Sequence, residues 1–149
     1  MDIHIFLAHA AKLELETEEA YLKLAELMTA QGNHDVAEFF GEMAGFSHLH
    51  REAVMRRADF DDSTNISSVI AALPASDTET PDLKDFAPSL DLDGAMTQAL
   101  ATERRGVTFY EDVSRTTTDA ETRLLAQEFA AEERGHVLAL ERFFGLVPY

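Results

Sequence analysis

The residues best suited to metal chemistry lie in the second half of this 149-residue chain. Glu103 precedes Tyr110 by seven residues, and the motif Glu133-x-x-His136 follows them. Side chains three residues apart on a helix share one face, so Glu133 and His136 can reach the same ion. Carboxylate oxygens together with imidazole nitrogens suit iron or manganese, and zinc would also fit, whereas sulfur ligands are absent. This half therefore carries two carboxylates and a histidine that could hold a metal ion.

The first half repeats the arrangement with one change. Glu14 precedes Tyr21 by seven residues, and Ser47-x-x-His50 follows. A carboxylate on one helix and Glu-x-x-His on the next, repeated twice, is the ligand pattern of a dinuclear site in a four-helix bundle. A pair of oxide-bridged ferric ions carries about four positive charges, which the four carboxylates of that pattern balance. With serine at position 47, the site is one carboxylate short.

Ser47 leaves three alternatives open: weaker binding of a second ion, a single ion, or a substitute ligand. Glu18 is the best substitute in the sequence because it lies one helical turn from Glu14. Glu132 and His48 are adjacent to site positions, but on a helix they are rotated away from them by about 100°. A carboxylate from a second subunit is a further alternative.

Four segments with helical periodicity position these residues, over about 2–31, 34–59, 93–115 and 119–144. Apolar residues recur every three or four positions, as the core of a helical bundle requires. The two histidines and three glutamates of the repeat fall on these apolar stripes and not on the charged faces. Gly32-Asn33 marks the end of the first helix, and Thr118-x-x-Glu121 has the pattern of a capping box that begins the fourth. The sequence thus predicts an all-α fold with a polar layer in its core.

A segment of different composition, about 60–92, separates the second and third helices and holds three of the four prolines. It could contain a short helix over Ile66 to Leu73, and the rest is typical of a loop. We interpret it as a long crossover between the second and third helices within one domain, residues 1–149. The alternative is a disordered linker between two helical hairpins.

Composition narrows the classes of function. The chain has no cysteine, which excludes disulfides, iron–sulfur clusters and thiol nucleophiles. Its 12 basic and 28 acidic residues give a formal charge of −16, which argues against nucleic acid and anionic membranes as partners. We find neither a signal peptide nor an apolar run of membrane-spanning length, so we expect a cytoplasmic protein.

With these motifs the chain resembles the rubrerythrin side of the ferritin-like superfamily. The Glu-x6-Tyr spacing, the small-residue turn after the first helix and the segment EFAAEERGH are similar to that family's helices. The resemblance implies a ferritin-like four-helix bundle whose metal ligands are Glu14, His50, Glu103, Glu133 and His136. The sequence departs from the family at Ser47 and at Gly106, where some rubrerythrins carry an additional glutamate.

The resemblance also implies a reaction, either Fe(II) oxidation or reduction of peroxide or O2, with iron as the cofactor (two ions, or one because of Ser47). A rubrerythrin-type peroxidase would need an external electron donor, because the chain lacks a cysteine-bearing rubredoxin module. Family members commonly form homodimers or larger homo-oligomers.

The candidate catalytic residues are the three carboxylates with Tyr21 and Tyr110. Each tyrosine either packs in the core with its hydroxyl bonded, or supports a ligating carboxylate or quenches radicals near iron. Two other functions stay open: iron binding or storage without turnover, and a degenerate bundle that serves as an interaction module.

Overall fold

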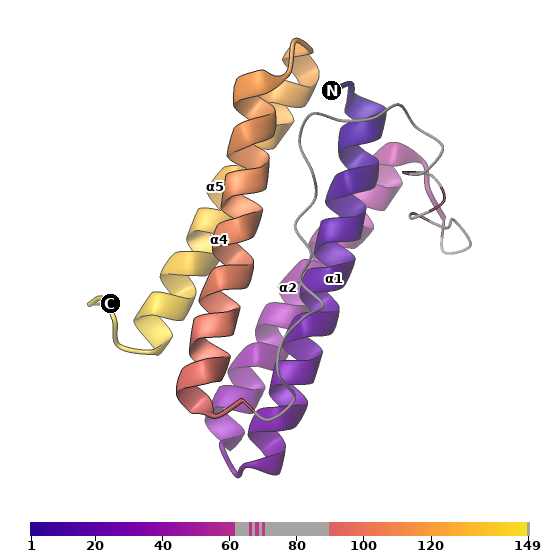
Figure 1. The fold of residues 1–149 in the computed structure, drawn as a ribbon. Coiled ribbons are helices and arrows are strands. Elements are labelled where there is room, and N and C mark those ends of the chain that lie inside the picture. Colours follow the sequence, from indigo (N-terminus) through magenta and orange to yellow (C-terminus); the bar gives the residue numbers. More distant parts are fainter. Residues whose placement is uncertain (62–65, 67, 69, 71–89, 149) are drawn as a thin grey trace.

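The computed structural model describes residues 1–61, 66, 68, 70 and 90–148. Within this part the chain forms four long helices and no strand (Figure 1), namely α1 (Ile3–Ala30), α2 (His34–Ala58), α4 (Leu92–Thr116) and α5 (Ala120–Phe143). Each helix begins and ends within one residue of the range expected from its periodicity. Most of the expected crossover at 60–92 lies outside the described residues. So does the expected short helix over Ile66 to Leu73, apart from three of its residues. None of the helices in the described segments is long and apolar enough to cross a membrane.

Aspartates cap three of the helices. The side chains of Asp2, Asp91 and Asp119 accept hydrogen bonds from backbone amides of the first turns of α1, α4 and α5. The expected cap at Thr118 is wrong by one residue, because Asp119 Oδ2 accepts from the backbone N–H of Thr122 at 2.9 Å. A carboxylate placed there also complements the positive end of the helix dipole.

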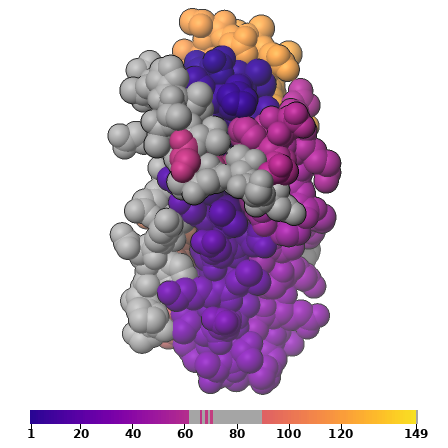
Figure 2. All heavy atoms as spheres, turned by 90° about the vertical axis from the view of Figure 1, so that its right-hand side faces the viewer, coloured from indigo at the N-terminus to yellow at the C-terminus, as the bar shows by residue number. Residues whose placement is uncertain are grey.

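The four helices are joined as two antiparallel hairpins, α1–α2 and α4–α5. A left-handed Gly32, with φ of +81°, makes the tight turn between α1 and α2 possible. Within each hairpin the helices pack along much of their length, as Figure 2 shows for α1 and α2 viewed from outside. The hairpins are therefore the local units of the fold.

The hairpins dock so that α1 and α4 run antiparallel. At one end Gln31 Nε2 donates to the carbonyl of Leu90 at 2.6 Å. At the other end the amino group of Met1 donates to Thr117 Oγ1 at 3.2 Å. Because α2 runs antiparallel to α1, the last turns of α2 and α4 lie at the same end of the bundle (Figure 1). The connection from α2 to α4 therefore joins opposite ends of the bundle, as in ferritin-like folds.

The core has two apolar clusters with a polar layer between them. One cluster is built around Phe6, Phe109 and Phe129, and the other around Met28 and Phe40. The predicted stripes are buried, and so are the glutamates that interrupt them: Glu14 and Glu103 are each 1% exposed and Glu133 is 3% exposed. Buried carboxylates are costly without compensation, so this layer requires an explanation beyond packing.

Candidate metal centre

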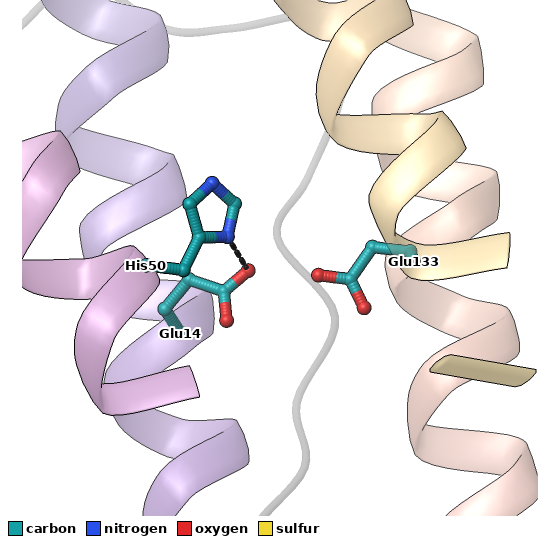
Figure 3. A group of neighbouring side chains, drawn as sticks. All are labelled: Glu14, His50 and Glu133. Carbon is teal, nitrogen blue, oxygen red and sulfur yellow. Dashed lines mark hydrogen bonds and ion pairs between the residues drawn. The ribbon is translucent and has the colours of Figure 1, made fainter. Parts of the chain in front are cut away.

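The first hairpin contributes Glu14 from α1 and His50 from α2. His50 Nδ1 lies 2.9 Å from Glu14 Oε1, with the imidazole ring above the carboxylate (Figure 3). Glu133 extends from α5 toward this pair from the opposite side (Figure 3). Atoms of all three side chains lie within 4.8 Å of one another, close enough to share one cation.

The second hairpin contributes Glu103 from α4 and Glu133 and His136 from α5. His136 Nδ1 lies 3.5 Å from Glu103 Oε2 and 3.4 Å from Glu133 Oε2. These three side chains form a second group with ligand atoms within 4.8 Å of one another. Glu133 belongs to both groups. The five expected ligands are thus brought together as two triads that share one carboxylate.

The two tyrosines of the repeat connect the hairpins crosswise. Tyr21 on α1 donates to Glu103 Oε1 on α4 at 2.7 Å. Tyr110 on α4 donates to Glu14 Oε1 on α1 at 3.2 Å. Sequence spacing placed each tyrosine near the glutamate of its own helix, but each hydroxyl bonds the glutamate of the other hairpin. Both hydroxyls therefore hold a candidate ligand in place, as hydrogen bonds around metal sites do.

Burial and neighbouring charge shift the pKa values of the second triad strongly. Burial, reinforced by the carboxylate of Glu133, raises the pKa of Glu103 to about 8. Burial opposes the protonation of His136, but its contacts with Glu103 and Glu133 outweigh that effect and raise its pKa to about 10. Burial and the charge of Glu14 raise the pKa of Glu133 as well. In the absence of a cation, bound protons therefore offset the negative charge of the carboxylates.

The tyrosine hydroxyls stay protonated and act as donors. Burial first, and then the charge of Glu103, raises the pKa of Tyr21 well above its ordinary value. Burial and the charge of Glu14 do the same to the pKa of Tyr110.

Several buried polar atoms in this layer lack a hydrogen bond within the described residues. They include Oε2 of Glu14, Oε2 of Glu103 and the hydroxyl of Ser47. Native cores seldom leave such atoms unpaired without a bound ion or water. Both carboxylates belong to the two triads, where Glu103 Oε2 lies 3.5 Å from His136 Nδ1 without forming a hydrogen bond. Oxygen and imidazole donors are what iron and manganese accept. The residues present therefore fit a dinuclear metal centre.

Glu18 is already paired and belongs to neither triad. Arg51 donates to Glu18 Oε2 at 2.9 Å, and His48 Nδ1 lies 3.2 Å from Glu18 Oε1. The sequence suggested Glu18 as a substitute for a carboxylate at position 47, but an arginine holds it at the edge of the α1–α2 hairpin. His48 lies outside the triads too, as its rotation on α2 predicts.

Glu132 reaches the site despite its position on the helix. Its Oε2 lies 3.3 Å from Nε2 of His50, on the far side of the ring from Glu14. Because the Glu132 side chain is 44% exposed, it approaches His50 from the surface. Its rotation of about 100° from Glu133 argued against such a role, but a long side chain spans that offset. The available signal was its position on the side of α5 that faces α2.

Gly106 makes room for the shared carboxylate. A Cβ atom at position 106 would lie 3.5 Å from Glu133 Cδ and Oε2. The Glu133 carboxyl group thus lies against this turn of α4, where alanine would just fit and a larger side chain would need the space of Glu133.

Comparisons with known proteins agree with this arrangement. Residues 6–144 match the family model described as Rubrerythrin. A crystal structure of an uncharacterized conserved protein from Magnetospirillum magnetotacticum MS-1 superposes with a TM-score of 0.76 at 31% identity, and the match covers 100% of this chain and 97% of that one. No curated protein matches the sequence. The resemblance read from the motifs is therefore confirmed for both the family and the all-α, ferritin-like fold.

Proposed function

Because this chain belongs to the rubrerythrin family, we propose that it is a non-haem iron protein that oxidises Fe(II) or reduces peroxide or O2. The observation that supports this proposal is the position of Glu133, which is shared by two carboxylate–histidine triads. A shared carboxylate is what two adjacent ions require as a bridge. Manganese or zinc would fit the same donors.

In this proposal each ion has its own terminal ligands. Glu14 and His50 would hold one ion and Glu103 and His136 the other, and Glu133, which belongs to both triads, would serve both. Bound iron would supply the redox chemistry. The protein holds the carboxylates through Tyr21 and Tyr110 and keeps them within the core, where electrostatic interactions are stronger than in water.

The electron balance requires a partner. Reduction of hydrogen peroxide to two waters consumes two electrons and two protons; bound Fe(II) would supply the electrons and solvent the protons. Re-reduction then needs an external electron donor, because the chain has no cysteine for an iron–sulfur or thiol relay of its own. We place this donor outside the chain.

Anaerobic titration of the metal-free protein with Fe(II) tests the proposal. We expect about two ions per chain and a near-ultraviolet absorbance change when peroxide is added. Glu133→Gln should reduce the stoichiometry, whereas Glu128→Gln, at an exposed position of the same helix, should not. Absence of stoichiometric binding together with absence of an absorbance change would contradict the proposal.

A specific observation also favours a second candidate, a bundle that uses its polar core without metal. His50 contacts Glu14, and His136 lies between Glu103 and Glu133, so the charges can pair without an ion. If this is correct, His136→Ala changes stability but not metal content.

A third candidate function is iron storage, which light scattering distinguishes from the other two. A storage protein would form a shell, whereas we propose a homodimer or a larger homo-oligomer.

A further inference from the structure

Position 47 is where this centre lacks a ligand. We propose that a small carboxylate anion of the size of formate binds beside Ser47 and supplies the fourth carboxylate of the metal pair. This inference rests on the proposed function, because the anion would be held by the bound ions as well as by the protein.

Contacts between α2 and α5 place Ser47 opposite Glu133. Phe46, the residue before Ser47, stacks on the ring of His136 with centroids 6.0 Å apart. His50, one turn later, contacts the ring of Phe129 at 4.4 Å. Because α2 and α5 run antiparallel, these two contacts bracket Ser47 on one helix and Glu133 on the other. Ser47 therefore lies at about the same depth in the bundle as Glu133, the carboxylate that the two triads share.

The chemistry of the Ser47 side chain fits an oxyanion. Ser47 is 1% exposed, and its hydroxyl makes no hydrogen bond to any residue that the structure describes. A buried hydroxyl of this kind is unfavourable until an acceptor reaches it. Beyond its γ atom, serine differs from glutamate by one carboxylate group, which has the size of formate. A formate ion would thus supply both the missing charge and the missing acceptor.

Charge balance favours an anion over a neutral ligand. Glu14, Glu103 and Glu133 together contribute three negative charges, fewer than two divalent ions carry. The other acidic side chains nearby have partners, since Glu18 pairs with Arg51 and Glu132 contacts His50. A small anion from solution would supply the fourth negative charge that the two triads lack.

A metal titration with and without formate tests the inference. Metal-free protein is titrated with Co(II) by calorimetry and visible spectroscopy, in carboxylate-free buffer containing either sodium formate or sodium chloride at equal ionic strength. We expect the second ion to bind at least about tenfold more tightly with formate than with chloride. We also expect ¹³C-formate to show paramagnetic relaxation by bound Co(II).

Three variants at position 47 serve as controls. Ser47→Glu should bind two ions without formate and should not respond to it. Ser47→Gln fills the same space without the charge, so its second ion should bind weakly under both conditions. Ser47→Ala keeps the space but loses the hydroxyl, so it should respond to formate at higher concentrations. Circular dichroism verifies the fold of each variant, and the formate–chloride comparison on the unaltered chain is decisive even if a variant does not fold.

The outcomes separate this inference from the proposed function. If two ions bind to the unaltered chain and formate changes neither affinity nor relaxation, the anion site is overturned and the metal site stands. If no ion binds under any condition, including to Ser47→Glu, the proposed function fails as well. An equal response of Ser47→Gln and the unaltered chain would also overturn the anion site, because the response would then not depend on the space at position 47.

Discussion

At the scale of single residues, the crosswise tyrosines are the features whose removal should be most visible. Tyr21→Phe removes the 2.7 Å hydrogen bond and leaves Glu103 Oε1 buried without its donor. We expect metal affinity to fall by about tenfold and the metal-free protein to lose about 1–3 kcal/mol of stability. Competition with a chelator measures the first effect and thermal unfolding measures the second.

Tyr110→Phe is the matched comparison. Its bond to Glu14 is longer, at 3.2 Å, so the same change should have a smaller effect. Equal behaviour of both variants and the unaltered chain would show that the tyrosines only fill space.

A second residue-scale prediction concerns Glu132. Metal-binding histidines commonly donate their other ring N–H to a carboxylate, which orients the ring and raises its basicity. Glu132 Oε2 lies 3.3 Å from His50 Nε2, an ion-pair contact in which the ring nitrogen does not yet make a hydrogen bond, and a small rotation of the Glu132 side chain would bring it into this role. Glu132→Gln should weaken binding of one of the two ions by about tenfold, with the other unchanged, as seen in a two-step Co(II) titration. The exposed Glu128→Gln is the control, and an equal loss in both variants would attribute the effect to surface charge.

At the scale of helices, Gly106 lowers the stability of α4 and leaves room beside Glu133. A Cβ atom there lies in ordinary contact with the Glu133 carboxyl group. Gly106→Ala should therefore stabilise the protein by about 0.5–1 kcal/mol through helix propensity and keep both ions. Gly106→Leu should displace Glu133 and reduce metal stoichiometry. Metal analysis and thermal unfolding of this pair test the idea, which is wrong if the leucine variant retains both ions.

The start of α5 gives a second prediction at this scale. Asp119 accepts hydrogen bonds from both the backbone N–H and the hydroxyl of Thr122. Asp119→Ala should remove this N-cap and lower the melting temperature by about 2–4 °C. Thr118→Ala, at the neighbouring exposed residue, should change it little. If Thr118→Ala lowered the melting temperature more than Asp119→Ala, Thr118 would be the N-cap instead.

At the scale of the whole molecule, the metal-free protein should lose stability as pH rises. The folded-state pKa of Glu103, about 8, lies above its ordinary value of 4.5. That of His136, about 10, lies above 6.5. The folded protein therefore binds protons that the unfolded chain releases, and this stabilisation is lost as pH rises through the folded-state values.

We accordingly expect the melting temperature of chelator-treated protein to be lower at pH 9 than at pH 6, by roughly 10 °C or more. Bound metal should reduce this difference, because ions replace the protons. An equal or higher melting temperature at pH 9 without metal would contradict the prediction.

Much of this architecture could be predicted from the sequence, because helical periodicity fixes which residues share a face. Glu103, Glu133 and His136 fall on buried stripes, and their meeting at one depth follows from the lengths of the hairpins. Contacts that depend on side-chain length and rotamer could not be predicted. These include the contact of Glu132 with His50 and the hydrogen bond that each tyrosine donates to a glutamate of the opposite hairpin.

The position of the centre between two hairpins has a consequence for folding kinetics. Each hairpin is local in sequence and can form quickly, whereas their docking closes a long loop. Docking also brings three carboxylates together in a medium of low dielectric, so this late step has a barrier unless protons or a cation offset their charge. A divalent ion that binds as the hairpins meet would lower that barrier. The supply of metal would then govern how fast newly made chains mature, before it governs any reaction they perform.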